Sequence, residues 1–524
     1  MRKLSADVVV IGGGSTGAGV VRDAAMRGHR AILLDRADLA QGTSGRFHGL
    51  LHSGGRYVVA DPGSGAECAS ENAIVSRIQA HAVERTGGLF IVGPEDDPAF
   101  GDKFLAGAAE AKMPVEEITP AQALALEPRV NPGLKRAFRV QDGTIDGWQI
   151  VWSATASARQ YGAQILPYTK VTAIQRADGA IQGVLALDLK TGEELAIECG
   201  FVLNCAGPWA GQVAQLAGCR PVEVVPGRGV MVAMSHRLVN MVINRCAKPA
   251  DGDIIVPDHT VCIIGTTDVK VDDPDRLEIP RREVQQLLDA GESLVPGFRQ
   301  ARAVHAWAGA RPLIKDDRVS SSDTRHMSRG MLIMDHQERD SLSGMLTIGG
   351  GKFTTYRLMA EHIVDAMEEK LGVNHPCRTA QEACPGQEDA RTYQVTHRLA
   401  ERQSNRLKDQ TICECELLGR QQLVDLMAEF PHATLDDLRR QSRLGMGPCQ
   451  GGFCSARAAG LAFAEGKVDI ERATGLLRLF LVNRWIGLWP ILHGDQVRQT
   501  ALDDWILQGI LDVDHLPDQT QEVV

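Results

Sequence analysis

The sequence predicts an α/β fold with a second, mixed sheet, followed by a small, mostly helical C-terminal domain that is rich in cysteine. Three observations lead to this expectation. Short apolar runs rich in β-branched residues recur along residues 1–375, with helical spacing between several of them. Glycine is frequent, at 54 of 524 residues, which is typical of a fold with many tight turns. After Gly372 the chain becomes short-helical and its last cysteines are clustered.

Length and composition narrow the class of protein. A chain of 524 residues allows two to four domains, and a hydrophobic share of 44% excludes disorder as the main state. The net charge of −10, without a block of basic residues, argues against nucleic-acid binding. No run of 18 apolar residues occurs, and the first apolar run ends in glycines instead of a cleavage site. We therefore expect neither a transmembrane helix nor a signal peptide.

The first 34 residues predict a βαβ unit. Residues 7–11 (DVVVI) are typical of a strand buried on both faces, residues 17–27 have helical spacing, and residues 31–34 form a second apolar run. Further strands are expected at residues 163–166, 183–187, 201–204, 230–233, 261–265 and 345–348, and helices at residues 68–85 and 354–371.

A glycine-rich turn joins the first strand to the first helix. Residues 12–17 (GGGSTG) fit the pattern G-x-G-x-x-G, in which the glycines permit a tight turn, approach to a pyrophosphate and close helix–strand packing. The helix N-terminus then faces the phosphates. Asp35 ends the second strand, where a carboxylate can bond a ribose hydroxyl. These features together predict a Rossmann-like dinucleotide-binding domain.

A Gly/Ser/Thr-rich stretch at residues 41–46 could line the second half of a long cofactor. From this stretch onward the chain resembles the FAD-dependent glycerol-3-phosphate dehydrogenases of the D-amino-acid-oxidase-like superfamily. The resemblance is carried, in the family's order, by HGLLHSGGRY at 48–57, NCAGPWA at 204–210, GTTD at 265–268, GARPL at 309–313 and GGGKFTTYR at 349–357. It implies FAD as cofactor and interleaved FAD-binding and substrate domains. The cofactor-binding residues are then expected to be Gly12, Gly13, Gly14, Ser15, Thr16, Gly17, Asp35, Arg36, Thr43 and Ser44.

A glycerol phosphate carries a dianion and a secondary alcohol, so its site needs cations and a proton acceptor. Arginine suits the first task because its fork matches phosphate oxygens. Arg311 is followed by Pro312, which restricts the local chain, and Lys352 follows three glycines. The resemblance places Arg311, Arg329, Arg56 and Lys352 near the substrate or the flavin.

Histidine is the natural candidate for the proton acceptor, because its pKa lies near neutrality. His52 matches a histidine in the family's flavin-proximal segment, and His48 competes with it. The aerobic homodimeric relatives carry a second active-site histidine after a Gly-Ser pair, where this chain reads Pro-Gly-Arg-Gly at 226–229. The identity of the base therefore stays open, and Arg228 is a candidate for part of that role.

Four cysteines near the C-terminus have ligand spacing, with C-x-C at Cys413 and Cys415 and C-x4-C at Cys449 and Cys454. Four thiolates can hold a zinc ion or a 2Fe–2S cluster, and C-x-C is unusual for structural zinc. The pattern, with GMGP at 445–448 and an expected helix at 455–464, resembles the bacterioferritin-associated ferredoxin-like 2Fe–2S domain. It favours a 2Fe–2S cluster, with zinc as the alternative.

Four parts are expected: an FAD-dependent body at 1–375, a linker at 376–394, the 2Fe–2S domain at 395–464 and an amphipathic tail at 465–524. This combination resembles the large catalytic subunit of the family's anaerobic respiratory enzymes. It implies oxidation of sn-glycerol 3-phosphate to dihydroxyacetone phosphate, with electrons leaving through iron–sulfur centres to a membrane quinone. The implied partners are a second catalytic subunit, together with a membrane-anchoring iron–sulfur subunit, on the cytoplasmic side of the inner membrane.

Two other functions stay open on sequence grounds. One is a flavin oxidoreductase of the same superfamily that acts on another small hydroxy acid or an amine. The other is a non-catalytic adaptor that uses the cysteines for electron transfer or metal delivery. The physiological acceptor, the subunit stoichiometry and the role of the tail cannot be derived from the sequence.

Overall fold

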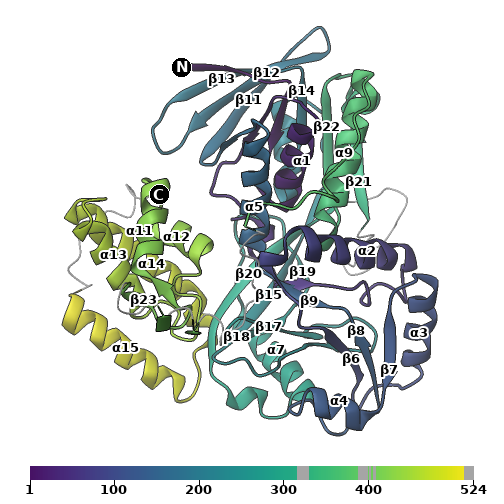
Figure 1. Cartoon of the computed structure of the whole chain (residues 1–524), viewed down its shortest axis with the longest axis vertical. Coiled ribbons are helices and arrows are strands. Elements are labelled where there is room, and N and C mark those ends of the chain that lie inside the picture. The colour runs from purple at the N-terminus through teal and green to yellow at the C-terminus, as the bar shows by residue number, and fades with distance from the viewer. Residues whose placement is uncertain (315–329, 387–398, 401–402, 405–408, 513–524) are drawn as a thin grey trace.

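The computed structural model describes residues 1–314, 330–386, 399–400, 403–404 and 409–512. Figure 1 shows a body built around two sheets, with a helical C-terminal lobe packed against one side. We call residues 409–512 the C-terminal lobe and the preceding described residues the body. Arg329, one of the expected substrate residues, lies outside the described residues.

The nucleotide-binding part is a six-stranded sheet in the order β10-β3-β2-β14-β22-β21. The first five strands are parallel and β21 is antiparallel. Helices α1, α5 and α9 cover one face, and the sheet β1-β13-β12-β11 covers the other. Because both faces are covered, the central strands read as continuous apolar runs. The strands are β2 (Val8–Ile11), β3 (Ala31–Leu34), β10 (Gln164–Leu166), β14 (Phe201–Asn204), β21 (Met331–Asp335) and β22 (Met345–Gly350), with β1 (Arg2–Ser5), β11 (Thr169–Ala177), β12 (Ala180–Asp188) and β13 (Glu194–Glu198) in the covering sheet.

The second part is a nine-stranded mixed sheet. Eight of its strands follow the order β19-β15-β18-β17-β16-β6-β8-β7, and the ninth, β20, pairs with β15. The strands of a small sheet, β4-β9-β5, precede and follow β6, β7 and β8 of the second sheet along the chain. Because the chain passes repeatedly from one sheet to the other, the two parts are interleaved as expected. The strands are β4 (Leu50–Leu51), β5 (Val83–Glu84), β6 (Gly88–Val92), β7 (Val115–Ile118), β8 (Arg136–Val140), β9 (Gly143–Ile145), β15 (Val224–Met234), β16 (Val242–Arg245), β17 (Ile254–Asp258), β18 (Val261–Gly265), β19 (Val269–Lys270) and β20 (Ala303–Ile314).

Five of the six further strands expected from sequence fall within strands of the structure, and the sixth, at 163–166, begins one residue before β10. The helix expected at 354–371 corresponds to α9, which begins at Tyr356. The helix expected at 68–85 is wrong in its bounds: α2 spans Pro62–Ile78. Asp61 caps it by accepting a bond from Ser64 N, and Pro62 suits a first helical position. Residues after Ile78 turn and join β5. The body's helices are α1 (Ser15–Met26), α2 (Pro62–Ile78), α3 (Phe100–Glu110), α4 (Pro120–Leu126), α5 (Gly147–Gln160), α6 (Ala210–Leu216), α7 (Arg281–Leu294), α8 (His336–Asp340) and α9 (Tyr356–Leu371).

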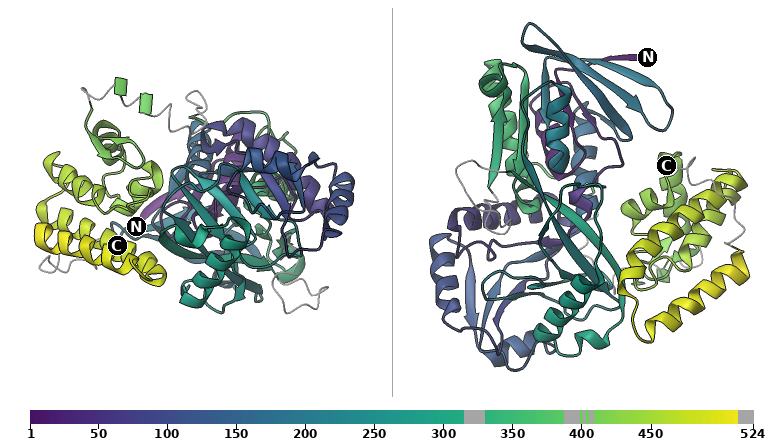
Figure 2. Two further views of the ribbon diagram at one scale, coloured as in Figure 1. Left: turned by 90° about the horizontal axis from the view of Figure 1, so that it is seen from below. Right: turned by 180° about the vertical axis from the view of Figure 1, so that it is seen from behind.

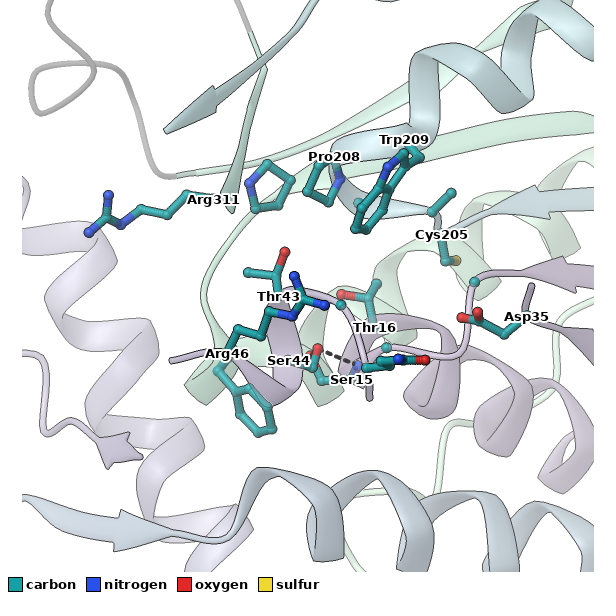
Figure 3. A pocket seen from close by; sticks show the side chains of 18 of the residues that line it. Ser15, Thr16, Asp35, Thr43, Ser44, Arg46, Cys205, Pro208, Trp209 and Arg311 are labelled. Carbon is teal, nitrogen blue, oxygen red and sulfur yellow. Dashed lines mark hydrogen bonds between the residues drawn. The ribbon is translucent and has the colours of Figure 1, made fainter. Parts of the chain in front are cut away.

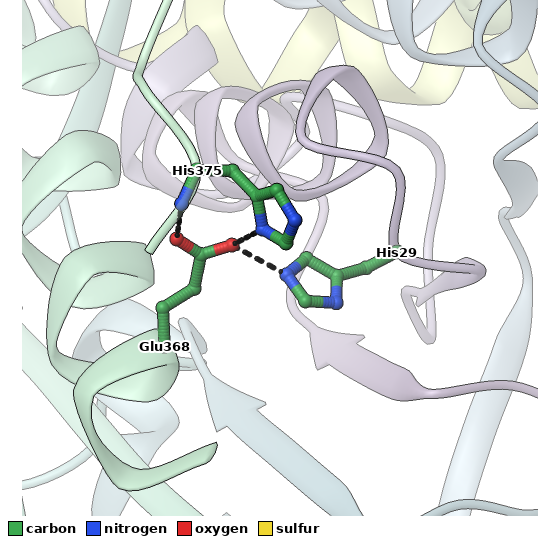
Figure 4. Close-up of side chains that lie close together, drawn as sticks. All are labelled: His29, Glu368 and His375. Carbon is green, nitrogen blue, oxygen red and sulfur yellow. Dashed lines mark hydrogen bonds and ion pairs between the residues drawn. The ribbon is translucent and has the colours of Figure 1, made fainter. Parts of the chain in front are cut away.

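The chain after α9 stays against the body as far as residue 386. Glu368 accepts hydrogen bonds of 2.8 Å from His29 Nε2, His375 Nδ1 and His375 N (Figure 4). Arg22 donates to the carbonyl oxygens of Thr379 and Glu382, at 3.2 and 2.7 Å. The first part of the expected linker is therefore fastened to the helix layer, and the division of the chain into four parts stays a prediction.

The C-terminal lobe has its own apolar core, which includes Leu423, Leu438, Leu476 and Phe480. Figure 2 shows its helices gathered beside the body. Its core joins helix α14, from the expected tail, to the segment that carries the cysteines. No described helix is both long and apolar enough to cross a membrane. The elements of the lobe are β23 (Thr411–Cys413), β24 (Leu418–Gly419), α11 (Arg420–Glu429), α12 (Leu435–Ser442), α13 (Cys454–Ala464), α14 (Ile470–Leu488) and α15 (Gln496–Leu511).

Candidate functional site

A cavity of about 610 Å³ opens at the carboxyl ends of β2, β3 and β14. In open α/β sheets this edge is the usual place for a ligand. Figure 3 shows Asp35 at one end of the cavity and Arg311 at the other, with Ser15, Ser44 and Arg46 between them. The cavity is therefore elongated and runs from the nucleotide-binding loop to the second sheet.

The glycine-rich loop is shaped by backbone packing. Gly12 has φ +113°, and a Cβ there would lie 2.5 Å from Cys205 O. A Cβ on Gly17 would lie 1.8 Å from Gly12 O. Gly14 precedes α1 and faces Ser44, whose Oγ accepts a 2.8 Å bond from Ser15 N. The N-terminus of α1 thus opens into the cavity, as expected for a pyrophosphate site.

Asp35 connects this loop to the end of β3. Its carboxylate accepts bonds from Gly13 N at 2.6 Å and Ala37 N at 2.8 Å, and it lines the cavity. Burial raises the pKa of Asp35 to about 6. Arg36 pairs with Asp275 at 2.6 Å and lies 4.8 Å from the ring centroid of Trp209. The two expected residues Asp35 and Arg36 therefore form one end of the cavity. Gly13 and Gly17 do not line it: Gly13 N donates to Asp35, and Gly17 packs against the backbone of Gly12.

The middle of the cavity contains side chains that the sequence analysis did not single out. Thr43 Oγ1 donates to Ala310 O at 2.6 Å, as part of the expected Gly/Ser/Thr-rich segment. Arg46, the last residue of that segment, and Phe47, which follows it, also line the cavity, and the ring centroids of Phe47 and Phe353 are 4.7 Å apart in a stacked pair. Burial, with Arg440 nearby, lowers the pKa of Arg46. The signal that could have pointed to these two residues was their position at the end of the segment, just before His48.

At the second end, His52 and Lys352 lie around Tyr57. His52 is buried, its ring centroid is 5.2 Å from that of Tyr57, and its backbone N donates to Thr354 Oγ1 at 3.4 Å. Lys352 Nζ donates to Ser64 Oγ at 2.9 Å and lies 4.8 Å from the Tyr57 ring. His48 also lines the cavity, and its Nδ1 accepts a bond from Leu50 N at 3.2 Å.

Arg311 is held on β20 by a set of acceptors. It pairs with Asp268 at 2.8 Å and donates to Thr267 O at 3.0 Å and to Thr266 Oγ1. Asp268 is only 5% exposed. These bonds fix the direction of the guanidinium, which lines the cavity 20% exposed. Arg311 and Lys352 thus supply two cations at the end that carries His52.

Two other arginines lie elsewhere. Arg56 pairs with the buried Asp253 at 3.2 Å and is not among the residues that line the cavity. The expectation for Arg228 is wrong: its guanidinium is buried, pairs with Glu283 on α7 and donates to Glu278 O at 2.9 Å. A buried carboxylate on the neighbouring helix attracts the side chain away from the cavity.

The four clustered cysteines meet in the C-terminal lobe. The thiol of Cys454 lies beside those of Cys413 and Cys449, and the thiol of Cys449 also lies beside that of Cys415. The neighbouring Cys454 lowers the pKa of Cys413 to about 7, and the neighbouring Cys415 and Cys454 hold the pKa of Cys449 far below its ordinary value. All four are free thiols. The four neighbouring thiols follow one another in the order Cys413, Cys454, Cys449 and Cys415. Four thiolates can ligate a zinc ion or an iron–sulfur cluster.

Comparison with known proteins decides the family. The family described as FAD dependent oxidoreductase matches residues 7–366. The chain is also 41% identical to a subunit of the anaerobic glycerol-3-phosphate dehydrogenase of Escherichia coli (strain K12), over 97% of each chain. The chain belongs to the FAD-dependent oxidoreductase family.

Within this family, the corresponding subunit of the anaerobic glycerol-3-phosphate dehydrogenase of Haloferax volcanii is 38% identical, over 98% of this chain and 92% of that protein. Among solved structures, the glycerol-3-phosphate dehydrogenase of Bacillus halodurans complexed with FAD has a TM-score of 0.65 at 23% identity. That alignment covers 94% of this chain and 96% of the other. The resemblance of the fold to a D-amino-acid-oxidase-like flavoenzyme is thereby confirmed.

Proposed function

We propose that this protein is the catalytic subunit of an anaerobic glycerol-3-phosphate dehydrogenase, which oxidises sn-glycerol 3-phosphate to dihydroxyacetone phosphate. The observation that carries the proposal is that one elongated cavity has a dinucleotide-type end at Asp35 and a cationic end at Arg311 and Lys352. Similarity over nearly the full length to proteins named as subunits of this enzyme supports it.

The residues present fit FAD. Gly14 has no side chain at the α1 N-terminus, where a Cβ would lie 3.1 Å from Ser44 Oγ. Asp35 lies where a ribose is expected, and Phe47 and Phe353 line the cavity further along as an aromatic pair. Thr43 and Ser44 hold the loop that faces the helix N-terminus. When bound, FAD takes up the hydride that leaves C2 of the substrate.

The chain's own residues then bind the substrate and remove its hydroxyl proton. Arg311 and Lys352 neutralise the phosphate dianion, and the bonds from Asp268 and Ser64 hold these two cations in place. His52 accepts the hydroxyl proton, with His48 as the competing base. The buried position of His52, against Tyr57, keeps its imidazole fixed and excludes water from that side.

We further propose that Cys413, Cys415, Cys449 and Cys454 ligate a 2Fe–2S cluster. Oxidation of the substrate releases two electrons and two protons, and such a cluster carries electrons singly as ferric iron becomes ferrous. The final acceptor is a quinone, which takes up both electrons and both protons. The electrons reach it through a second catalytic subunit together with a membrane-anchoring iron–sulfur subunit. The relatives are named as subunits of an enzyme, which supports the existence of partners. This arrangement corresponds to a peripheral position on the cytoplasmic side of the inner membrane.

An anaerobic visible spectrum of the purified chain tests the proposal. We expect bound flavin, bleaching on addition of sn-glycerol 3-phosphate, and no bleaching by glycerol, lactate or sarcosine at the same concentration. Iron and acid-labile sulfide should be present in equal amounts, and the dithionite-reduced protein should give a 2Fe–2S EPR signal. Bleaching by another hydroxy acid or an amine alone would overturn the substrate, and zinc in place of iron would overturn the cluster.

A further inference from the structure

One arginine of the C-terminal lobe contacts three carboxylates at the boundary with the body. Arg443 follows α12, and its side chain is 8% exposed. Its Nη1 lies 3.2 Å from Asp146 Oδ2 and its Nη2 2.9 Å from Asp258 Oδ2, both in the body. Its Nε lies 3.0 Å from Glu416 Oε2, in the lobe. A planar guanidinium can serve three acceptors at once, which the single ammonium of lysine cannot do with the same geometry.

The two partners in the body belong to the framework of the FAD cavity. Asp146 follows β9 and caps α5 by accepting bonds from Trp148 N and Gln149 N. Strand β9 pairs with β4, which ends one residue before His52. Thr144 of β9 donates to Pro257 O at 2.8 Å, which fastens the strand that ends in Asp258. Arg443 is therefore connected through short, bonded strands to the end of the cavity that carries His52.

The partner in the lobe belongs to the cysteine site. Glu416 is fully buried, follows Cys415 directly and also accepts a 3.3 Å bond from Thr260 in the body. A Cβ on Gly447 would lie 2.3 Å from Cys415 Cβ and 3.3 Å from Thr260 Oγ1. The cysteine loops are thus packed directly against the body's loop between β17 and β18.

We propose that Arg443 is a positioning residue, which holds the four-cysteine site at a fixed separation from the FAD cavity so that electrons pass between them. The proposal rests on the proposed function. Without Arg443, three carboxylates of like charge would remain close together, two of them buried and Asp258 partly buried, and the boundary would loosen. Electron transfer weakens steeply with distance, so a small opening slows it strongly. Arg440, paired with Asp38 at 2.9 Å, would still keep the lobe attached.

The test compares R443Q and R443K with R457Q in the full-length holoprotein. Arg457 is a matched control because it pairs with Glu414, beside the same cysteines, but is 45% exposed and makes no ion pair with the body among the described residues. Flavin bleaching and cluster reduction by sn-glycerol 3-phosphate are followed by stopped flow and freeze-quench EPR. Dithionite reduces the cluster independently of the substrate. Hydrogen exchange of residues 256–262 and 411–416 reports the boundary itself.

In R443Q we expect wild-type flavin bleaching, a wild-type EPR signal with dithionite, at least tenfold slower cluster reduction by substrate, and faster exchange in both segments. R443K should lie between R443Q and the wild type, and R457Q should match the wild type. Wild-type cluster reduction in R443Q, or loss of the cluster with both reductants, would overturn the positioning role. Absence of iron from the wild-type protein would overturn the proposed cluster. In that case hydrogen exchange still tests whether Arg443 holds the lobe against the body, and unchanged exchange in R443Q would overturn that role too.

Discussion

Replacing Arg311 by alanine should weaken phosphate recognition while leaving FAD in place. Arg311 lies at the opposite end of the cavity from Asp35. Loss of one charge-assisted hydrogen bond costs about 1.5–3 kcal/mol, which corresponds to a roughly tenfold to hundredfold rise in KM for sn-glycerol 3-phosphate. FAD content should stay near that of the wild type, because the loop at residues 12–17 and Asp35 are untouched.

The structure adds a complication that the experiment must remove. R311A leaves Asp268, 5% exposed, without its 2.8 Å partner, and breaking a buried pair in this way destabilises by about 3–5 kcal/mol. The double variant R311A/D268N also removes the charge of that carboxylate, so its KM reports recognition of the phosphate more directly. D268N alone keeps the guanidinium and should raise KM less than the double variant does.

The assay is steady-state reduction of an artificial dye, with sn-glycerol 3-phosphate and with glycerol as substrates. Glycerol lacks the phosphate, so its weak oxidation, measured at a concentration far above that of the phosphate ester, should change by less than threefold. An unchanged KM for the phosphate ester in R311A/D268N, with full FAD content, would refute the role of Arg311. An equal loss of activity with both substrates would show that Arg311 supports the fold of the site and does not bind phosphate.

Four further predictions follow from the same geometry. Gly14→Val should lower FAD content, because the added methyl groups fill the space beside Ser44, whereas Gly460→Ala, with open space around it, should not. His52→Asn should reduce kcat by about 10²–10⁴-fold with FAD retained, measured by dye reduction, and an effect below threefold would favour His48. Cys454→Ser should lose iron and quinone reduction but keep flavin bleaching by substrate, whereas full quinone activity without iron would show another electron exit. Hydrogen bonds from its partners lower the pKa of Glu368 to about 2, so its carboxylate stabilises the fold fully above pH 4.5 and loses this effect as the pH falls toward 2. In urea titrations, the difference in unfolding free energy between wild type and E368Q should therefore shrink as the pH falls from 5 to 3. A constant difference would contradict this.

The unit from residue 8 to Asp35 was predictable from sequence because its determinants are local. A buried parallel strand needs a continuous apolar run, and the turn needs glycine where φ is +113° at Gly12 or where a backbone oxygen approaches Gly17. The cysteine spacing and the resembling segments likewise pointed to several residues that lie together in the lobe or in the cavity, such as Arg311 and Lys352, but Arg56 does not line the cavity and Arg329 lies outside the described residues. Family membership confirms the type of fold, and the roles of the individual residues stay predictions.

The tertiary structure alone decided where the long side chains go. Arg228 on β15 follows Gly227, the residue that pairs with Arg311 on β20, yet Arg228 turns to Glu283 while Arg311 lines the cavity. Arg443 meets Asp146 across 297 residues of sequence. An arginine has several rotatable bonds, and its direction is set by whichever buried carboxylate the fold brings near. Periodicity and glycine spacing constrain the backbone within a few residues, whereas the ion pairs that aim these side chains exist only after distant strands and helices have packed together.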